Sequence, residues 1–360
     1  YNLNGDIMNN YEALKSNLIP SHILNELLNV YKWMGKNEDI EEKLGDTAQQ
    51  LMEKNLEKEV EFLCKYLNLK VSDNRMRLLI TKGSNSLNKE EQAVTSIKDV
   101  LRTIINDAKE FPFNGSDLLQ YLNKIFGKNS TKFTTRIYNE LLVGEFDPKK
   151  TSIRAMLENM LNEYHKNLQN KSYEAIYLSM VTYLQMDIMR PYDNHSDFGC
   201  LLALYYMMLK SGCICFKYFG FFEGILSDEA SWNELKKLCY VNFPTSLIQV
   251  NVIMKKVLTM IEENYQKLSD ILKHKVYEKR MFKSDGLEQT ILRMPYTFTK
   301  EDVRKYHPNV SESTLNRALF KLRDEKVIMP LGKGRSARWV KLISDDDPRV
   351  LFGGNYENRD

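Results

Sequence analysis

The sequence lacks any long apolar run. Its most apolar stretch, Phe198 to Leu209, is 12 residues long, whereas a membrane-spanning helix needs about 18 or more. The N-terminus also lacks a basic segment followed by an apolar one, which is the pattern of a secretion signal. We therefore expect no membrane partner and a cytoplasmic location. We also expect that Phe198 to Leu209 forms a buried core helix.

Cysteine is scarce. The chain has five cysteines, in apolar surroundings, at positions 64, 200, 213, 215 and 239. An odd and scattered set argues against a disulfide framework and favours reduced thiols. Cys213 and Cys215 are close together, but no second pair with histidines at zinc spacing accompanies them. We therefore predict that these thiols pack in the core and form no metal site.

Signals for β-structure are sparse, and the sequence shows no internal repeat of the length of a helical or β-repeat unit. Helical periodicity dominates, and the apolar residues of Val94 to Ile105 fall on one stripe of a helix. Similar patterns predict helices over 153–167, 173–189 and 252–272. A short hairpin near 133–143 and another near the C-terminus are the strands that we expect. The predicted fold class is mainly α.

The length of 360 residues is too great for one ordinary hydrophobic core. A Gly/Ser/Asn-rich break at 82–86 and a charged stretch at 274–286 indicate boundaries. The predicted parts are an N-terminal helical segment (1–87), a helical core (88–275), a C-terminal domain (280–345) and a flexible tail (346–360).

The charge is unevenly distributed. Between Thr299 and Ile343, eleven Lys and Arg outnumber five Asp and Glu, a net charge of +6. Because the whole chain carries +3, the remainder carries −3. A basic excess confined to one domain favours a polyanionic partner for that domain.

The same domain contains two capped helix starts. Thr299 is a good N-cap, and Asp302 stands at the capping-box position. This helix must end by His307, because Pro308 forces the residue before it out of helical geometry. Ser311 caps a second helix, and two capped helices joined by a tight turn predict a helix-turn-helix. Apolar pairs suited to hydrophobic staples flank both caps: Phe298 with Val303, and Val310 with Leu315.

The second helix and the residues after it predict a winged helix-turn-helix that binds duplex DNA. Leu315, Ala318, Leu319 and Leu322 form the buried stripe, and a strand, a glycine turn and a second strand follow over 327–340. The predicted DNA-binding residues are Ser313, Thr314, Asn316, Arg317, Lys321, Lys333, Arg335 and Arg338. Arginine can pair with guanine and asparagine with adenine, so we expect specificity from Arg317. The other cations would supply salt-dependent affinity for phosphates.

The central stretch, 88–264, resembles the Fic (fido) family, whose members transfer AMP from ATP to a hydroxyl of a target protein. The resemblance rests on the order and spacing of Arg136, Phe146-Asp147-Pro148, the loop from Met189 to Phe198, and an apolar helix that ends at 210–212. The family also joins this domain to a winged helix ending in Gly-x-Gly-Arg-Ser, as Gly332 to Ser336 do here. The resemblance implies a Fic-like helical core with a short β-hairpin, followed by an α+β winged helix-turn-helix.

This chain departs from the family motif, His-Pro-Phe-x-Asp/Glu-Gly-Asn-Gly-Arg. Pro191 matches, and Tyr192 is conservative. Arg190 stands at the position of the catalytic histidine, and a guanidinium cannot accept a proton at neutral pH. Asn194 replaces the carboxylate that binds magnesium. The other positions differ as well: His195 and Asp197 replace glycines, Ser196 the asparagine and Phe198 the phosphate-binding arginine.

The leading hypothesis is a DNA-binding regulator whose core is a pseudoenzyme with no cofactor. In this reading Arg190 pairs with Asp193 or Asp197, and Asp197 caps the helix that begins near Phe198. The regulatory motif of the family, Ser/Thr-x-x-x-Glu-Gly, has only a weak counterpart in 81–86, where asparagine replaces the glutamate.

Two alternatives stay open. One is an active transferase with a rearranged site, in which His195 is the base and ATP and magnesium are bound. The other is a protein-interaction adaptor. Besides duplex DNA, the partners that we consider are a second copy of the chain in a homodimer and a nucleotide or a protein at the Fic-like cleft.

Overall fold

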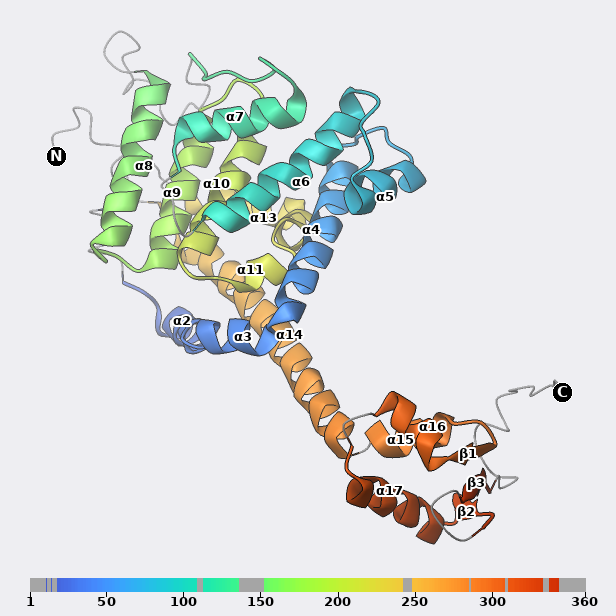
Figure 1. The fold of residues 1–360 in the computed structure, drawn as a ribbon. Coiled ribbons are helices and arrows are strands. Elements are labelled where there is room, and N and C mark those ends of the chain that lie inside the picture. The colour runs from blue at the N-terminus through green and yellow to red at the C-terminus, as the bar shows by residue number, and fades with distance from the viewer. Residues whose placement is uncertain are drawn as a thin grey trace. The chain divides into compact units, whose positions relative to one another are not determined.

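The computed structural model divides into two compact units, Tyr1–Ser269 and Asp270–Asp360 (Figure 1). It describes residues 11, 14, 18–108, 113–135, 152–241, 248–284, 286–307, 310–332 and 337–342. Within the described residues, no helix is both long and apolar enough to cross a bilayer.

The N-terminal unit is built from helices. In chain order they are α2 (Ser21–Met34), α3 (Asn37–Leu44), α4 (Asp46–Tyr66), α5 (Asp73–Lys82), α6 (Lys89–Asp107), α7 (Gly115–Phe126), α8 (Ile153–Gln169), α9 (Ala175–Met189), α10 (Ser196–Lys210), α11 (Cys215–Tyr218), α12 (Phe222–Leu226) and α13 (Glu229–Cys239). The long helix α14 (Asn251–Ser284) continues past the end of this unit.

Helices α9 and α10 form the centre of the N-terminal unit. They pack against each other, α8 packs on α9, and α7 packs on α10 (Figure 1). Both central helices are buried on nearly every side, which explains why α10 is apolar all round rather than amphipathic. The prediction of a buried core helix over Phe198 to Leu209 is confirmed. The predicted apolar stripe of Val94 to Ile105 is buried along α6, as expected.

The first helices belong to the same compact unit as the core. α4 packs against α6, α11 and α12, so the chain on both sides of the break at 82–86 contributes to one unit. The charged stretch 274–286, which we expected to mark a boundary, is helical to Ser284 as part of α14. The division into four parts remains a prediction.

The C-terminal unit surrounds a small core of its own. Its elements are α15 (Gly286–Arg293), β1 (Thr297–Thr299), α16 (Lys300–Tyr306), α17 (Glu312–Asp324), β2 (Ile328–Pro330) and β3 (Arg338–Lys341). The strands form an antiparallel sheet in the order β1-β3-β2. Helices and sheet share a buried cluster that includes Ile291, Phe298, Leu319 and Trp339.

Individual capping hydrogen bonds confirm the predicted helix starts of this unit. Thr299 and Asp302 form a capping box at the start of α16, and the Ser311 hydroxyl accepts the Thr314 backbone N–H at the start of α17. The predicted buried stripe of α17 is buried, and α16 ends before His307. Several predicted features lie outside the described residues: Arg136 and the rest of the hairpin to 143, Phe146 to Pro148, and the wing residues Lys333 and Arg335.

Candidate functional site

The loop between α9 and α10 is held by backbone bonds to the segment 130–134. The Thr134 N–H donates to the Pro191 carbonyl over 2.9 Å, and the Asp193 N–H donates to the Lys132 carbonyl over 3.0 Å. In return, the Lys132 N–H donates to Asp193 Oδ1 over 2.8 Å. The Asp193 carboxylate is therefore bound to backbone, and Arg190 forms an ion pair with Asp197 instead.

Tyr192 anchors the loop to the core. Its side chain is 3% exposed, and its hydroxyl donates to the Gly115 carbonyl at the start of α7 over 2.8 Å. Its ring packs against Phe133, with the centroids 5.5 Å apart. A Cβ at Gly199 would lie 3.2 Å from the Tyr192 ring, so the helix approaches this ring closely because glycine stands there. The buried Tyr192 side chain therefore fixes the loop to the core.

Arg190 and Asp197 pair across the loop. Arg190 adopts a left-handed backbone conformation at the end of α9, and its guanidinium lies 3.0 Å from Asp197 Oδ2. Both side chains are more than half exposed. The prediction that Asp197 caps α10 is wrong. The N-cap is His195, α10 begins at Ser196, and Asp197 lies in the first turn, where its carboxylate faces a cation rather than backbone N–H groups.

The His195 ring is stacked on an aromatic ring. Its centroid lies 3.6 Å from that of Phe126, and the two planes are nearly parallel. Partial burial lowers the pKa of His195, an effect that the nearby Asp193 carboxylate opposes. Phe126 covers one face of the imidazole, and this stacking leaves the in-plane ring nitrogens uncovered.

The two remaining polar side chains of the loop bond within the chain. The Asn194 amide donates to the Ser130 carbonyl over 3.2 Å. The Ser196 hydroxyl accepts the Tyr192 N–H over 3.4 Å. Phe198, at the position of the phosphate-binding arginine, is buried. These positions therefore stabilise the loop and contribute no free carboxylate for a metal ion.

The described residues include no group of three or more His, Cys, Asp or Glu arranged to hold a metal ion. All five cysteines are free and buried, as predicted. Burial raises the pKa of Cys64 and of Cys239 to about 12, which keeps these thiols protonated at neutral pH.

The weak counterpart of the regulatory motif is mostly not helical. Thr81 and Lys82 end α5, Gly83 takes a left-handed conformation, and 84–86 are irregular. Asn85 therefore lies in a loop rather than on a helix.

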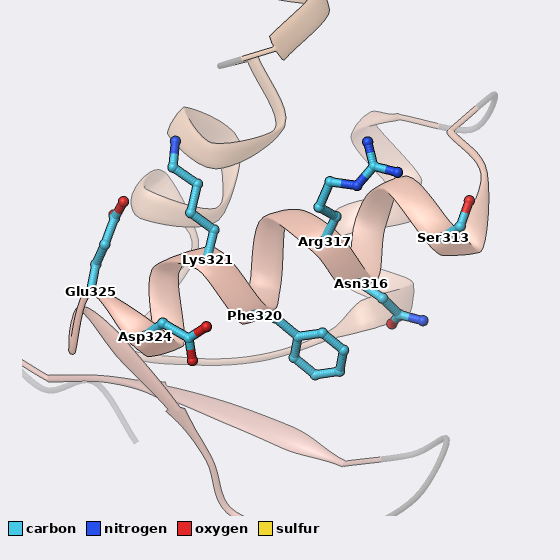
Figure 2. A pocket seen from close by; sticks show the side chains of 7 residues that line it. All are labelled: Ser313, Asn316, Arg317, Phe320, Lys321, Asp324 and Glu325. Carbon is cyan, nitrogen blue, oxygen red and sulfur yellow. The ribbon is translucent and has the colours of Figure 1, made fainter.

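A shallow groove of about 680 Å³ follows the outer face of α17 (Figure 2). It is lined by Ser313, Asn316, Arg317, Phe320, Lys321, Asp324 and Glu325. The side chains of Arg317 and Lys321 lie on one side of this face, and those of Asn316 and Phe320 on the other (Figure 2). The spacing of three and four residues places all of them on one helix face.

The two cations of the groove differ in their partners. Lys321 Nζ lies 2.8 Å from Glu288 Oε2 on α15, so part of its charge is neutralised within the unit. Arg317 is exposed and has no ion-pair partner among the described residues. Two carboxylates, Asp324 and Glu325, lie at the C-terminal end of the groove. The groove is therefore basic toward its N-terminal half and acidic at its other end.

Four other predicted DNA-binding residues are placed as follows. The hydroxyls of Ser313 and Thr314 lie 2.9 and 2.8 Å from the capping Ser311 hydroxyl. Asn316 is half-buried, and its Oδ1 has no hydrogen-bond partner among the residues that the structure describes. Arg338 is exposed at the start of β3.

The groove also contains an exposed aromatic side chain that was not predicted from the sequence. Phe320 is 45% exposed, and the Arg323 guanidinium lies 4.8 Å from its ring centroid. The signal was present, because Phe320 stands three residues after Arg317 on the outer face.

Comparison with known proteins defines the fold. No protein-family model and no curated protein matches the sequence. Among solved structures, a Fic domain-containing signalling protein from Bacteroides thetaiotaomicron has a TM-score of 0.50 and 13% identity. The match covers 68% of this chain and 97% of that one. At this identity the likeness shows the fold alone: the chain has a mainly helical, Fic-like fold, as predicted.

Two further matches have lower TM-scores. A Fic family protein from Desulfovibrio desulfuricans has a TM-score of 0.46 and 11% identity, over 92% of this chain and 98% of that one. Fic-1 from C. elegans has a TM-score of 0.44 and 12% identity, over 70% of this chain and 75% of that one.

Proposed function

We propose that the chain is a DNA-binding regulator, in which the C-terminal unit is a winged helix-turn-helix and the Fic-like core no longer transfers AMP. The helix-turn-helix consists of α16 and α17, and the strands β2 and β3 flank the wing. The observation that carries the proposal is the outer face of α17. There Arg317 is exposed and unpaired among the described residues, on a helix that is capped and packed on its inner face.

Arg317 would read base edges in the major groove, because an arginine can make two hydrogen bonds to guanine. The pairing of Lys321 with Glu288 makes Lys321 a weaker contributor than its position suggests. Arg338, with the wing residues Lys333 and Arg335, would contact phosphates. The net charge of +6 between Thr299 and Ile343 supports an electrostatic attraction to DNA.

The proposal for the core rests on the 190–198 loop. Arg190, at the position of the motif histidine, is paired with Asp197 and cannot act as a proton acceptor. Asn194, at the position of the metal-binding carboxylate, donates its amide to Ser130. In this proposal the core serves in dimerisation, ligand sensing or partner docking.

A selection from a randomised duplex library at about 50 mM salt tests DNA binding, because phosphate contacts are strongest at low salt. Affinity for the enriched duplex is then measured by fluorescence anisotropy. We expect Arg317→Ala to weaken binding about 5- to 100-fold, as the loss of a two-bond base contact would. Arg293→Ala, which removes an exposed cation of α15 that does not line the groove, is the matched control and should change affinity by no more than about twofold. Failure to enrich any duplex would contradict the proposal.

Incubation of the whole chain with labelled ATP and magnesium tests the core. We expect no transfer of label to protein. Label that appears with the wild type and disappears with His195→Ala would instead favour the rearranged transferase.

A further inference from the structure

The groove on α17 lies beside the point at which the last described strand ends. The Leu342 N–H, directly after β3, donates to the Val327 carbonyl over 2.8 Å, and the Val327 N–H donates to the Leu322 carbonyl over 2.9 Å. Val327 is the third residue after the end of α17. The chain that follows Leu342 therefore starts next to the C-terminal end of the groove.

Residues 343–360 carry charge opposite to that of Arg317. Three consecutive aspartates stand at 345–347, and the apolar residues Val350, Leu351 and Phe352 follow them. The groove offers Arg317, which is exposed and unpaired among the described residues, and the exposed ring of Phe320. An acidic segment followed by an apolar one thus complements a surface with an exposed cation and an exposed aromatic ring.

The chain from Leu342 to Asp347 is long enough for the aspartates to reach Arg317. An extended chain spans about 3.3 Å per residue, so Asp347 can lie up to about 17 Å from Leu342. Arg317 lies about 10 Å along the helix axis from the C-terminal end of α17, at about 1.5 Å per residue. The aspartates can therefore pass Asp324 and Glu325 and reach Arg317. Because the segment is tethered, its effective concentration at the groove is in the millimolar range.

We propose that residues 345–352 of this chain dock in the α17 groove, with the aspartates on Arg317 and the apolar residues against Phe320. The contact itself needs only these residues. Its consequence rests on the proposed function: the docked segment occupies the surface that would bind DNA and so lowers DNA affinity until DNA displaces it. A competing site for the aspartates is Lys326, which is exposed and also lies beside Val327.

The contact is tested without DNA, by NMR of the arginine Nε–Hε groups in the whole chain. The Arg317 resonance is assigned by its loss in Arg317→Lys. We expect it to shift in a tail variant, in which Asp345, Asp346 and Asp347 are all changed to Asn. It should not shift in the control Glu38→Gln/Glu42→Gln/Asp46→Asn, which removes three exposed carboxylates from the other unit. An unchanged Arg317 resonance in the tail variant would overturn the proposal.

Two more outcomes of this measurement show which segment occupies the groove and which cation the aspartates contact. If the shift grows with protein concentration, the segment of a second copy fills the groove, and docking within one chain is wrong. If Lys326→Ala moves the Arg317 resonance as far as the tail variant does, the aspartates depend on Lys326, and the assignment to Arg317 is wrong.

The consequence is tested with the enriched duplex. The tail variant should bind it about tenfold more tightly than the wild type, and the control triple variant within about twofold of the wild type. An equal gain in both variants would show a general charge effect and overturn the inhibitory role. If the Arg317 resonance shifts as expected and no variant binds any duplex, the proposed function fails and the docked segment stands.

Discussion

Two polar contacts of the 190–198 loop lie in very different surroundings. The Tyr192 hydroxyl is buried against the Gly115 carbonyl, whereas the pair of Arg190 with Asp197 faces solvent. A buried carbonyl that loses its donor costs about 1–2 kcal/mol, and an exposed ion pair contributes at most about 1 kcal/mol. The loop therefore depends on its tyrosine more than on its ion pair.

We predict that Tyr192→Phe lowers the free energy of unfolding by about 1–2 kcal/mol and Arg190→Ala by less than about 1 kcal/mol. Urea unfolding followed by far-UV circular dichroism would measure both. A larger loss for Arg190→Ala than for Tyr192→Phe would identify the ion pair as the main anchor.

Glu59 of α4 is a buried carboxyl with an unusual environment. It is 4% exposed, its Oε1 has no hydrogen-bond partner within the part of the chain that the structure describes, and the Phe222 N–H donates to its Oε2 over 3.2 Å. Burial raises the pKa of Glu59 to about 8, against the opposing effect of the backbone N–H groups of 221–223. Because the pKa is higher in the folded chain than in the unfolded one, the contribution of Glu59 to stability is greatest at acidic pH and falls as the pH rises toward 8.

We predict that Glu59→Gln removes this loss. Relative to the wild type, the variant should gain stability between pH 5 and pH 8, on the order of 3 kcal/mol. Urea unfolding of both proteins at several pH values measures the difference. Parallel pH profiles would contradict the prediction.

The sequence could indicate single-residue contacts only where the partners are close in the chain. The pairing of Arg190 with Asp193 or Asp197 was foreseeable, and the structure selects Asp197. The pairing of Lys321 with Glu288 was not foreseeable, because 33 residues separate them and only the packing of α15 against α17 brings them together.

At the scale of elements, the helix starts of the C-terminal unit rest on local bonds. The Thr299 hydroxyl accepts the Asp302 N–H, and the Asp302 carboxylate accepts the Thr299 N–H. We predict that Thr299→Ala lowers the thermal stability of this unit by about 1 kcal/mol, the usual cost of a lost N-cap. Thr297→Ala, the same substitution at an exposed position of β1, is the control and should change little. Equal losses in the two variants would contradict a capping role. Near-UV circular dichroism during heating measures both.

These elements show what the sequence could predict. The caps and buried stripes of α16 and α17 follow from patterns within one turn of helix, and they are confirmed. The start of α10 was misplaced, because His195 takes a left-handed conformation that side-chain preferences do not reveal. The charged composition of 274–286 suggested a boundary; the structure shows that α14 continues to Ser284, and the division into parts stays a prediction.

At the scale of the whole molecule, each unit buries a core of its own. In the C-terminal unit, Trp339 is 3% exposed and lies within that core. We predict that a fragment of residues 270–360 folds by itself and unfolds cooperatively in urea. Trp339 is the single tryptophan of such a fragment, so a red shift of its fluorescence reports the transition. A gradual shift without a sigmoidal transition would show that the unit depends on the rest of the chain.

The burial of all five cysteines has a practical consequence. Thiol reagents act on the accessible thiolate, so the native sulfur atoms are shielded while the chain is folded. A cysteine introduced at an exposed position such as 313 can therefore carry a fluorescent or spin label without removal of any native thiol. The native thiols in turn become reactive only when the core opens. Their rate of alkylation therefore reports how often the core opens.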